Sequence, residues 1–531
     1  MQTSPIYFHN GRIHPDPRST HRVEALLIRD GRVRAAGSGS EVGSRVGPET
    51  QRIDLGGKTV IPGLVDAHLH FAKYARWLRM VDCEQPTMAA CLERVSKQAA
   101  ATPPDTWILG HGWNQNTWGA FGEQGELDSA VPDHPAYLTA KSMHAAWANS
   151  RALQIAGIDG STPDPEDGLI QRNERGEATG ILFEGAMRLV SDHIPSPTEE
   201  QLADDLSAAQ NKLSEVGLTG VHDFDGPTCF RALQILHERG DLQLRVIKNI
   251  PVAHLAAARN LGLRSGFGDA WIRIGNIKVF ADGALGPRTA AMFQPYDGEP
   301  ENRGMLFQDS EALVEIFEEA ANSGFGMAVH AIGDRANHEV LNAYGLLRKF
   351  EKERNLPHRR HRIEHLQILH PDDLARPSEL DIIASMQPIH ATSDMEMADR
   401  YWGDRTSRAY AWHTQFEAGA RLAFGSDAPV ENPDPLLGLH AATTRRKPDG
   451  SPGMEGWVPD QRLEIGEALA AYTIGPAYAA GTETWQGQLI PGYAADLIVL
   501  KQDPFAVEGD QLLDLKPQGT MVAGEWTYRA F

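Results

Sequence analysis

The sequence predicts an α/β protein: a (β/α)8 TIM barrel with a small β-sandwich domain formed from both termini and a long insertion after the first barrel strand. Three observations lead to this fold class. Eight strand-like apolar runs alternate with helix-like sequence in the middle of the chain. Short strands with hairpin signals occur at both ends. About 145 residues separate the first apolar run from the second, far more than one strand–helix unit needs.

The eight apolar runs are the predicted barrel strands. They cover residues 59–71, 217–225, 242–250, 272–282, 326–333, 362–367, 384–390 and 421–430. Helix-like sequence, such as residues 310–323 and 336–353, separates the later runs. Strands that alternate with helices are typical of a parallel sheet, and a count of eight favours a closed barrel.

Both ends of the chain have the pattern of short strands joined by turns. Asn10-Gly11 and Asp30-Gly31 stand between apolar runs, and residues 519–527 predict a hairpin that turns at Ala523-Gly524. Asn-Gly and Asp-Gly are hairpin signals because these residues tolerate a positive φ. We therefore expect the two termini to assemble into one β-sandwich, with the barrel as a long excursion between them.

These elements predict three domains. Residues 1–58 and 482–531 form the β-sandwich, and residues 59–79 and 206–481 form the barrel. Residues 80–205 form the insertion, which is rich in tryptophan, glycine and asparagine. Because the loops that follow barrel strands surround the active site, we expect the insertion to be a lid or substrate subdomain.

Composition argues against several classes of function. The net charge is −21, from 50 basic and 71 acidic residues, whereas nucleic acids and anionic membranes are bound by basic surfaces. The 3 cysteines are too few for a disulfide framework in 531 residues, so we expect buried free thiols. No apolar run approaches the roughly 18 residues of a membrane span, and the N-terminal stretch lacks the pattern of a secretion signal. We expect a cytoplasmic protein.

Two histidines close the first predicted barrel strand. His68 and His70 are separated by one residue, and alternate residues of a strand face the same side. Both imidazoles can therefore point into the mouth of the barrel, where active sites of this fold lie. Two histidines on one face at a strand end indicate a metal site, although a His-x-His pair also occurs as ordinary surface or core residues.

Other predicted strand ends carry ligand-type residues as well. His330 closes the fifth run, His365 closes the sixth, and Asp427 closes the eighth. Each alone is compatible with a core histidine or a helix-capping aspartate. Because the carboxyl ends of parallel strands meet at one rim, their convergence predicts a metal centre built from four strand ends.

Lys278 lies within the apolar fourth run. Burial of an ammonium group is costly and lowers the pKa of lysine. A neutral amine can add carbon dioxide to form a carbamate, whose two oxygens can bridge two metal ions. The alternative is a lysine in a salt bridge, with Asp282 or Asp223 as partner, and the spacing does not choose between the two.

With these residues, the chain resembles the amidohydrolase superfamily, and within it the amidohydrolase-3 branch of YtcJ-like proteins, which includes N-substituted formamide deformylases. The matching segments are residues 62–70, 278–286, 330–334, 362–365, 425–429 and 491–497. The resemblance spans nearly the whole chain and implies a barrel that carries a β-sandwich built from both termini. It also implies a metal-dependent amidohydrolase that acts on carbon–nitrogen bonds other than peptide bonds.

The resemblance assigns roles to the strand-end residues. His68 and His70 with Asp427 would hold the more buried metal, His330 and His365 would hold the outer one, and Lys278 as a carbamate would bridge them. One or two divalent ions per chain are expected, most simply Zn²⁺, with Fe²⁺ and Mn²⁺ as alternatives for such ligands. Asp427 would accept the proton of the metal-activated water and pass it to the leaving nitrogen.

Three residues are candidates for substrate contacts. Trp113 and His144 lie in segments of the insertion that resemble segments near the active site in this branch, although both can instead pack the insertion. Arg288 follows the fourth strand and is positioned in sequence to meet a carboxylate or carbonyl group of the substrate.

The leading function is hydrolysis of an amide, N-acyl or N-formyl bond of a small molecule by metal-activated water. A mononuclear deaminase or cyclic-amide hydrolase is the alternative, in which Lys278 is structural and His365 contacts substrate. A catalytically silent barrel scaffold is a third interpretation, because fold alone does not prove activity. By analogy we expect a homodimer.

Overall fold

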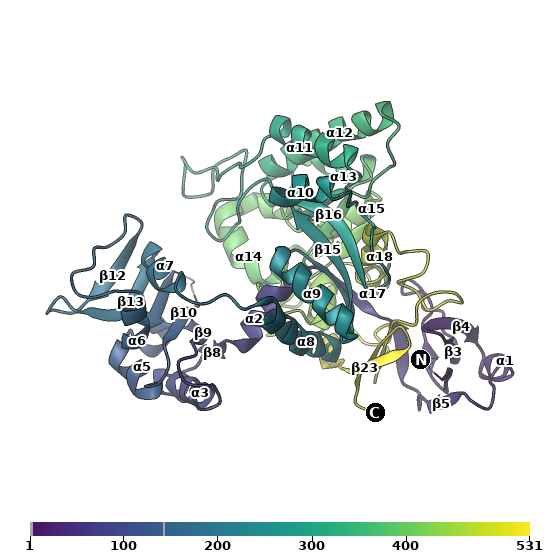
Figure 1. Cartoon of the computed structure of the whole chain (residues 1–531). Coiled ribbons are helices and arrows are strands. Elements are labelled where there is room, and N and C mark those ends of the chain that lie inside the picture. Colours follow the sequence, from purple (N-terminus) through teal and green to yellow (C-terminus); the bar gives the residue numbers. More distant parts are fainter. Residues whose placement is uncertain (1–3, 142–143) are drawn as a thin grey trace. The chain divides into compact units, whose positions relative to one another are not determined.

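The structure, a computed structural model, describes residues 4–141 and 144–531 (Figure 1). Residues 1–3, which belong to the stretch on which the prediction about a secretion signal was made, and residues 142–143 lie outside the described part of the chain. The chain forms two compact units, one of residues 1–74 and 199–531 and the other of residues 75–198. The boundaries of the three predicted domains remain a prediction.

An eight-stranded parallel sheet forms the barrel of the first unit, which confirms the predicted fold class. Its strands in order are β7 (Leu64–Leu69), β14 (Leu218–Asp223), β15 (Arg245–Pro251), β16 (Ile272–Phe280), β17 (Met327–Ala331), β18 (Arg362–His365), β19 (Ile383–Met386) and β20 (Leu422–Phe424). A parallel bridge between Leu69 and Ala428, just beyond β20, brings the last strand against the first and closes the barrel.

Helices lie between the barrel strands, because parallel neighbours need a crossover connection, and the last three helices of the first unit follow the final barrel strand β20. They are α2 (Phe71–Arg79), α8 (Glu199–Glu215), α9 (Pro227–Arg239), α10 (Leu255–Asn260), α11 (Ser310–Asn322), α12 (Asp334–Glu353), α13 (Arg376–Glu379), α14 (Pro388–Trp402), α15 (Trp412–Glu417), α16 (Pro435–Thr444), α17 (Ile465–Ala471) and α18 (Ile474–Ala480). The two helices predicted over residues 310–323 and 336–353 are α11 and α12. Asp309 starts α11 by accepting a hydrogen bond from the backbone N–H of Ala312.

Two of the predicted barrel strands have one wrong boundary each. Residues 59–71 divide at Gly63, where a Cβ atom would lie 2.3 Å from the side chain of Thr219, and only the part after Gly63 belongs to the barrel. Residues 384–390 also divide, because β19 ends at Met386 and Pro388 begins α14. Proline is favoured in the first turn of a helix, so His390 lies on a helix and not on a strand.

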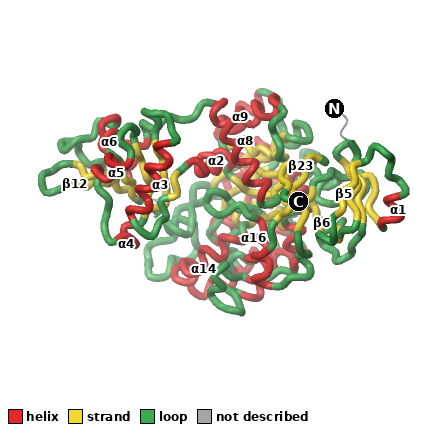
Figure 2. Tube along the Cα trace, turned by 90° about the horizontal axis from the view of Figure 1, so that it is seen from below, coloured by secondary structure: helices red, strands yellow, loops and turns green. Residues whose placement is uncertain are grey.

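The strands of both termini form two further sheets, seen together in Figure 2 around the labels β5, β6 and β23. One contains β1 (Ile6–His9), β3 (Ala25–Arg29), β4 (Arg32–Gly37) and β5 (Gln51–Asp54), with the short helix α1 (Gly39–Gly43) after β4; the other contains β2 (Arg12–Ile13), β6 (Thr59–Pro62), β21 (Leu497–Leu500), β22 (Pro517–Val522) and β23 (Glu525–Arg529). Phe8 of the first sheet and Val60 and Val499 of the second share one buried apolar cluster. The two termini therefore build one core.

The hairpin signals have different outcomes. Asp30-Gly31 joins the antiparallel pair β3 and β4, and Ala523-Gly524 joins β22 and β23, with all four residues at positive φ. These two predictions are confirmed. The Asn10-Gly11 hairpin is wrong, because β1 pairs with β3 and β5 whereas β2 pairs with β6. The positive φ of Asn10 carries the chain from one sheet to the other.

The second unit is an α/β unit with its own sheet. Its strands are β8 (Val81–Asp82), β9 (Ile108–Trp113), β10 (Ala136–Ala140), β11 (Ala145–Ala148), β12 (Gly168–Arg172) and β13 (Ala178–Glu184); its helices are α3 (Met88–Ala100), α4 (Gln115–Trp118), α5 (Gln124–Ala130), α6 (Ser150–Ile155) and α7 (Arg188–Ser191). Cys83 and Cys91 lie in its core, and they and Cys229 are buried free thiols, as expected. Across the described residues of both units, no helix combines the length and apolarity that a membrane span requires.

A buried ion pair links the β-sandwich to the barrel within the first unit. Arg245, at the start of β15, donates two hydrogen bonds to the Asp496 carboxylate, at 2.7 and 2.9 Å, and its guanidinium lies over Trp271 and Trp485. Asp496 also accepts a hydrogen bond from the backbone N–H of Ala523. Both charged side chains are almost completely buried.

We expect Asp496→Asn to lower the stability of the first unit by about 3–5 kcal/mol, because it leaves the buried Arg245 guanidinium without its counter-charge. The measurement is the urea midpoint followed by circular dichroism. Asp16→Asn, which breaks the exposed Arg18–Asp16 pair, is the control and should cost only about 0–1 kcal/mol. Equal midpoints for the two variants would contradict the structural importance of the pair.

Candidate metal centre

His68 and His70 stand at the C-terminal end of β7, where alternation along the strand places both beside the mouth of the barrel. His68 is buried, and its Nδ1 lies 2.6 Å from Oε2 of Glu364. Nδ1 of His70 lies 3.1 Å from Oδ1 of Asp225. A carboxylate is only an acceptor, so in each histidine Nδ1 carries a proton, and in the neutral form of the ring Nε2 has a free lone pair.

Asp427 follows β20 and lies beside both histidines. Its Oδ1 is 3.5 Å from Nε2 of His68 and 3.4 Å from Nε2 of His70. Its Oδ2 is 3.4 Å from Nε2 of His390. Burial acts to raise the pKa of Asp427, but its contacts with His390 and His70 hold the pKa well below the usual range. The carboxylate is therefore ionised, and its Oδ1 faces Nε2 of both His68 and His70.

His365 completes the innermost group. One ligand-type atom from each of His68, His365 and Asp427 lies within 4.8 Å of the others. Nδ1 of His365 is 2.8 Å from Oε1 of Gln387, which again leaves Nε2 free. His365 and Asp427 both have a positive φ, an uncommon backbone conformation for residues with a side chain, of the kind that gathers at functional sites.

His330 lies next to this group with a different orientation. The centroid of its ring is 4.5 Å from that of His365. Its Nε2 lies 2.9 Å from the carbonyl oxygen of Gly283, which requires a proton on Nε2 and leaves Nδ1 as the free nitrogen. The structure thus brings His330 beside the other candidates, but not into the group of three atoms.

Three of the four histidines, His68, His330 and His365, are held in their neutral form, whereas at His70 burial is outweighed by hydrogen bonds with Asp225 and Asp427, which raise the pKa. Burial lowers the pKa of His68 to about 4 and that of His330 to about 3, and the positive charge of Lys278 acts in the same direction. Burial also lowers the pKa of His365 well below its usual range. Neutral imidazole is the form that binds metal, so the environment of these residues prepares them as ligands.

Lys278 is a buried amine whose Nζ has no hydrogen-bond partner among the described residues. Nζ lies 4.9 Å from the ring centroid of Phe224 and 4.8 Å from that of Phe280. Burial lowers the pKa of Lys278 to about 8. The fraction of neutral amine near pH 8 is therefore large.

The two proposed salt-bridge partners of Lys278 are engaged elsewhere. Oδ2 of Asp223 accepts a hydrogen bond from Nζ of Lys248 at 2.5 Å. Asp282 accepts hydrogen bonds from the backbone N–H groups of Ala291, Ile332 and Gly333. The alternative of a salt-bridged Lys278 with either of these partners is therefore wrong.

Four residues at the site were not predicted from the sequence. Glu364, Asp225 and Gln387 hold the outer nitrogens of His68, His70 and His365, and His390 lies against Asp427. Burial would lower the pKa of His390, but hydrogen bonds with Asp427 and Glu431 raise it to about 10. The only signal in the sequence was position, since Glu364 precedes His365 directly and Asp225 ends the second apolar run.

The predicted substrate contacts in the insertion differ in their surroundings. Trp113 is 1% exposed in the core of the second unit, and its indole N–H donates to the carbonyl oxygen of Leu138 at 2.7 Å. As a substrate contact it is corrected to a packing residue, because both its ring and its polar atom are satisfied internally. His144 is exposed, and its Nδ1 lies 2.9 Å from Glu184.

Arg288 lies in the loop after β16 and is paired within that region. Its Nε is 2.6 Å from Oε1 of Glu299, and its guanidinium lies 5.1 Å from the ring centroid of Tyr401. These residues line a cavity of about 450 Å³ that none of the candidate metal ligands lines. The structure therefore does not bring Arg288 together with the histidine group.

Neutral histidines and an ionised carboxylate that converge at the C-terminal ends of barrel strands define a metal-dependent hydrolase. The chain belongs to the amidohydrolase family, whose profile matches residues 51–528.

Two relatives are similar along nearly their whole length. The YtcJ protein of Bacillus subtilis (strain 168) is 34% identical over 532 residues, which cover 98% of this chain and 99% of the relative. The N-substituted formamide deformylase of Arthrobacter pascens is 29% identical over 533 residues, with 95% of each chain covered. An uncharacterized metal-dependent hydrolase of Pyrococcus horikoshii OT3 has a TM-score of 0.80 at 29% identity and covers 96% of this chain and 99% of its own. Together they support a hydrolase that acts on carbon–nitrogen bonds.

We expect Trp113→Ala to destabilise the second unit by about 3–5 kcal/mol, because it leaves a cavity in a closed core. Thermal unfolding and metal content are measured together, and metal content should stay at the wild-type value. Leu169→Ala on β12, where the side chain is half exposed, is the control and should change the midpoint little. A Trp113→Ala protein with wild-type stability and a raised KM would restore the role of Trp113 as a substrate contact.

Proposed function

We propose that the protein hydrolyses the carbon–nitrogen bond of a small amide, N-acyl or N-formyl compound, with one or two divalent ions held by the strand-end residues. The observation that carries this proposal is the approach of His68, His365 and Asp427, whose ligand atoms lie within 4.8 Å of one another. Three strand ends that are distant in sequence contribute these atoms.

The residues at the site fit a divalent ion. The Nε2 lone pair of His68 and the ionised Oδ1 of Asp427 face each other at 3.5 Å, an arrangement of two acceptors that a shared cation makes favourable. Imidazole and carboxylate are the usual ligands of Zn²⁺, with Fe²⁺ and Mn²⁺ as other candidates. In our proposal His68, His70 and Asp427 hold the inner ion, and His330 and His365 hold the outer one.

Lys278 is the proposed bridge between two ions. Its Nζ is buried and unpartnered among the described residues, and its lowered pKa provides the neutral amine that carbon dioxide requires. The carbamate forms when the amine nitrogen bonds to the carbon of carbon dioxide and releases one proton, which leaves a carboxylate-like group with two oxygens. The reaction converts the unpartnered amine of Lys278 into an anionic ligand.

Ions bound at this centre would supply a nucleophile from water at neutral pH and would polarise the scissile carbonyl. Asp427 accepts the proton of the attacking water at Oδ2, because Oδ1 is the oxygen directed at His68 and His70. His390, 3.4 Å from Oδ2, holds that oxygen in place. Asp427 then delivers the proton to the leaving nitrogen, so that the carbon–nitrogen bond breaks and an acid and an amine are released.

An N-substituted formamide is our first candidate substrate, because a relative that shares 29% of its residues over nearly the full length is named for that activity. Formate and an amine would be the products. Zinc is our first candidate metal.

Metal content per chain tests the number of ions and the role of Lys278. Protein purified without chelators and supplied with bicarbonate should contain about two metal ions, and Lys278→Met should reduce this to about one. Inductively coupled plasma mass spectrometry gives the count. Carbon-13 NMR after addition of labelled bicarbonate should show a carbamate signal in the wild type only.

A wild-type content of about one ion, unchanged in Lys278→Met, would contradict the bridge. It would favour a mononuclear deaminase or cyclic-amide hydrolase in which Lys278 is structural. A chain that bound no metal and hydrolysed no amide would instead favour a silent scaffold.

We expect Asp427→Asn to lower kcat by about 10²–10⁴-fold with little change in KM, because an amide cannot accept the proton of the attacking water. Steady-state hydrolysis of a formamide substrate gives both constants, and metal content is measured on the same sample. Asp394→Asn removes a half-buried carboxylate, which accepts a hydrogen bond from Tyr410, and serves as the control with kcat near wild type. An Asp427→Asn protein that retains both metal and wild-type kcat would exclude this role.

A further inference from the structure

A closed polar network lies beneath the candidate metal ligands, in the interior of the barrel. Arg362 and Glu364 both belong to β18, and alternation along the strand directs both side chains to the same face. They form a double ion pair in which the side chains are 2% and 0% exposed. Glu364 in turn accepts the hydrogen bond from Nδ1–H of His68 at 2.6 Å.

The remaining donors of Arg362 are also satisfied. The guanidinium donates to the carbonyl oxygen of Ala67 at 2.7 Å, to Oγ of Ser385 at 2.6 Å and to Nδ1 of His222 at 2.9 Å. Four barrel strands, β7, β14, β18 and β19, are therefore connected through one side chain. Through its ion pair with Glu364, Arg362 therefore fixes the orientation of the carboxylate that accepts the hydrogen bond from His68.

A buried ion pair is weak evidence for stability, since apolar side chains of similar volume often replace such pairs without loss. The residue at which the hydrogen-bond network ends says more about its role. The network ends at one nitrogen of one imidazole and leaves the other nitrogen facing Asp427 at 3.5 Å, an acceptor opposite an acceptor. A network that served packing alone would not need to end there.

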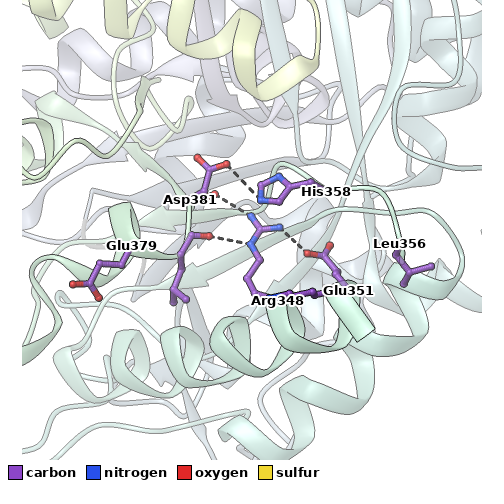
Figure 3. Close-up of a pocket in the computed structure, with 8 residues that line it drawn as sticks. Arg348, Glu351, Leu356, His358, Glu379 and Asp381 are labelled. Atoms are coloured by element: carbon purple, nitrogen blue, oxygen red, sulfur yellow. Dashed lines mark hydrogen bonds and ion pairs between the residues drawn. The ribbon is translucent and has the colours of Figure 1, made fainter. Parts of the chain in front are cut away.

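The same chain contains a second arginine–glutamate–histidine triad that allows a direct comparison. Arg348 donates to Glu351 at 2.7 Å, and Glu351 lies 3.0 Å from Nε2 of His361; Figure 3 shows Arg348 turned toward Glu351 beside a cavity of about 410 Å³. This triad lies near the N-terminal ends of β18 and β19, away from the strand ends that carry the ligands. Nδ1 of His361 accepts the backbone N–H of Met327, so both ring nitrogens are used within the fold.

We propose that Glu364 and Arg362 are positioning residues for the metal centre: their buried ion pair fixes His68 as the Nδ1–H tautomer and so directs the lone pair of Nε2 at the ion shared with Asp427. The inference rests on the proposed metal-dependent function. Neither residue touches the substrate or the ion; both act through His68. Partners of this kind influence metal affinity strongly in other metalloproteins.

The test compares Glu364→Gln with the matched variant Glu351→Gln in the full chain. Each substitution removes the negative charge of one buried arginine–glutamate–histidine triad, so both should lower the urea midpoint. Chelator-treated protein is titrated with Zn²⁺ or Co²⁺, and the dissociation constant is measured by competition with a chromophoric chelator. We expect Glu364→Gln to raise this constant by about 10–100-fold and Glu351→Gln to leave it unchanged.

The visible absorption of bound Co²⁺ provides a second measurement, because it reports the geometry of the ligands. The band positions should change in Glu364→Gln and match the wild type in Glu351→Gln. If Glu364→Gln does not fold, Glu364→Asp replaces it: the shorter carboxylate keeps the charge but moves away from Nδ1 of His68. Arg362→Lys, which keeps the charge and loses the double contact, should weaken metal binding in the same direction.

The possible results separate this inference from the proposed function. A wild-type protein that binds neither ion would overturn the metal-dependent function itself. A wild type that binds metal, with Glu364 variants that match it in affinity and in Co²⁺ spectrum, would overturn the positioning role alone. Equal weakening by Glu364→Gln and Glu351→Gln would also overturn it, because the effect would then belong to general destabilisation.

Discussion

The closure of the barrel between its first and last strands is the constraint on which the site depends. The backbone N–H of Asp427 donates to the carbonyl oxygen of His68 at 2.6 Å, and that of His70 donates to Ala428 at 2.9 Å. The approach is so close that a Cβ atom at Gly425 would lie 2.4 Å from the backbone nitrogen of His68. Two segments about 360 residues apart in sequence thus become neighbours, and the candidate metal centre lies at the seam of the barrel.

In the closed barrel, the hydrogen bond made by Nδ1 of His68, His70 and His365 determines whether Nε2 is available as a ligand atom. Carboxylates hold His68 and His70, and an amide oxygen holds His365. The fold therefore specifies tautomers as well as positions, which a cluster of unsupported histidines would not achieve. Asp225 has a further effect, since it also accepts the backbone N–H groups of Ala72 and Lys73 and so ties the first turn of α2 to His70.

The fold and the positions of the candidate ligands were predictable where local rules apply, and the residues that hold their outer nitrogens were not. Alternation along β7 places His68 and His70 on one face, and strand–helix alternation gives the barrel and its rim. Glu364 reaches His68 across 296 positions, a contact that only the folded barrel creates. Pro388 shows the opposite case: a local signal for a helix start was present, yet the apolar run obscured it and placed His390 on a strand. Trp113 was assigned by resemblance, and the core of its own unit decided its role.

Charge balance explains why one group of ligand-type atoms is suited to a metal and a neighbouring group is not. Within the described residues, Asp223, Asp225 and Cys229 also bring three such atoms within 4.8 Å. There the chain supplies its own cation: Nζ of Lys248 donates to the Asp223 carboxylate and to the carbonyl oxygen of Asp225. At the other group the amine of Lys278 has no hydrogen bond to any described residue and lies 4.9 Å from the ring centroid of Phe224 and 4.8 Å from that of Phe280. Lys248 supplies the cation of the group of Asp223, Asp225 and Cys229. The group of His68, His365 and Asp427 has no such hydrogen-bonded amine among the described residues, which is why our proposal places a bound ion there and not at the other group.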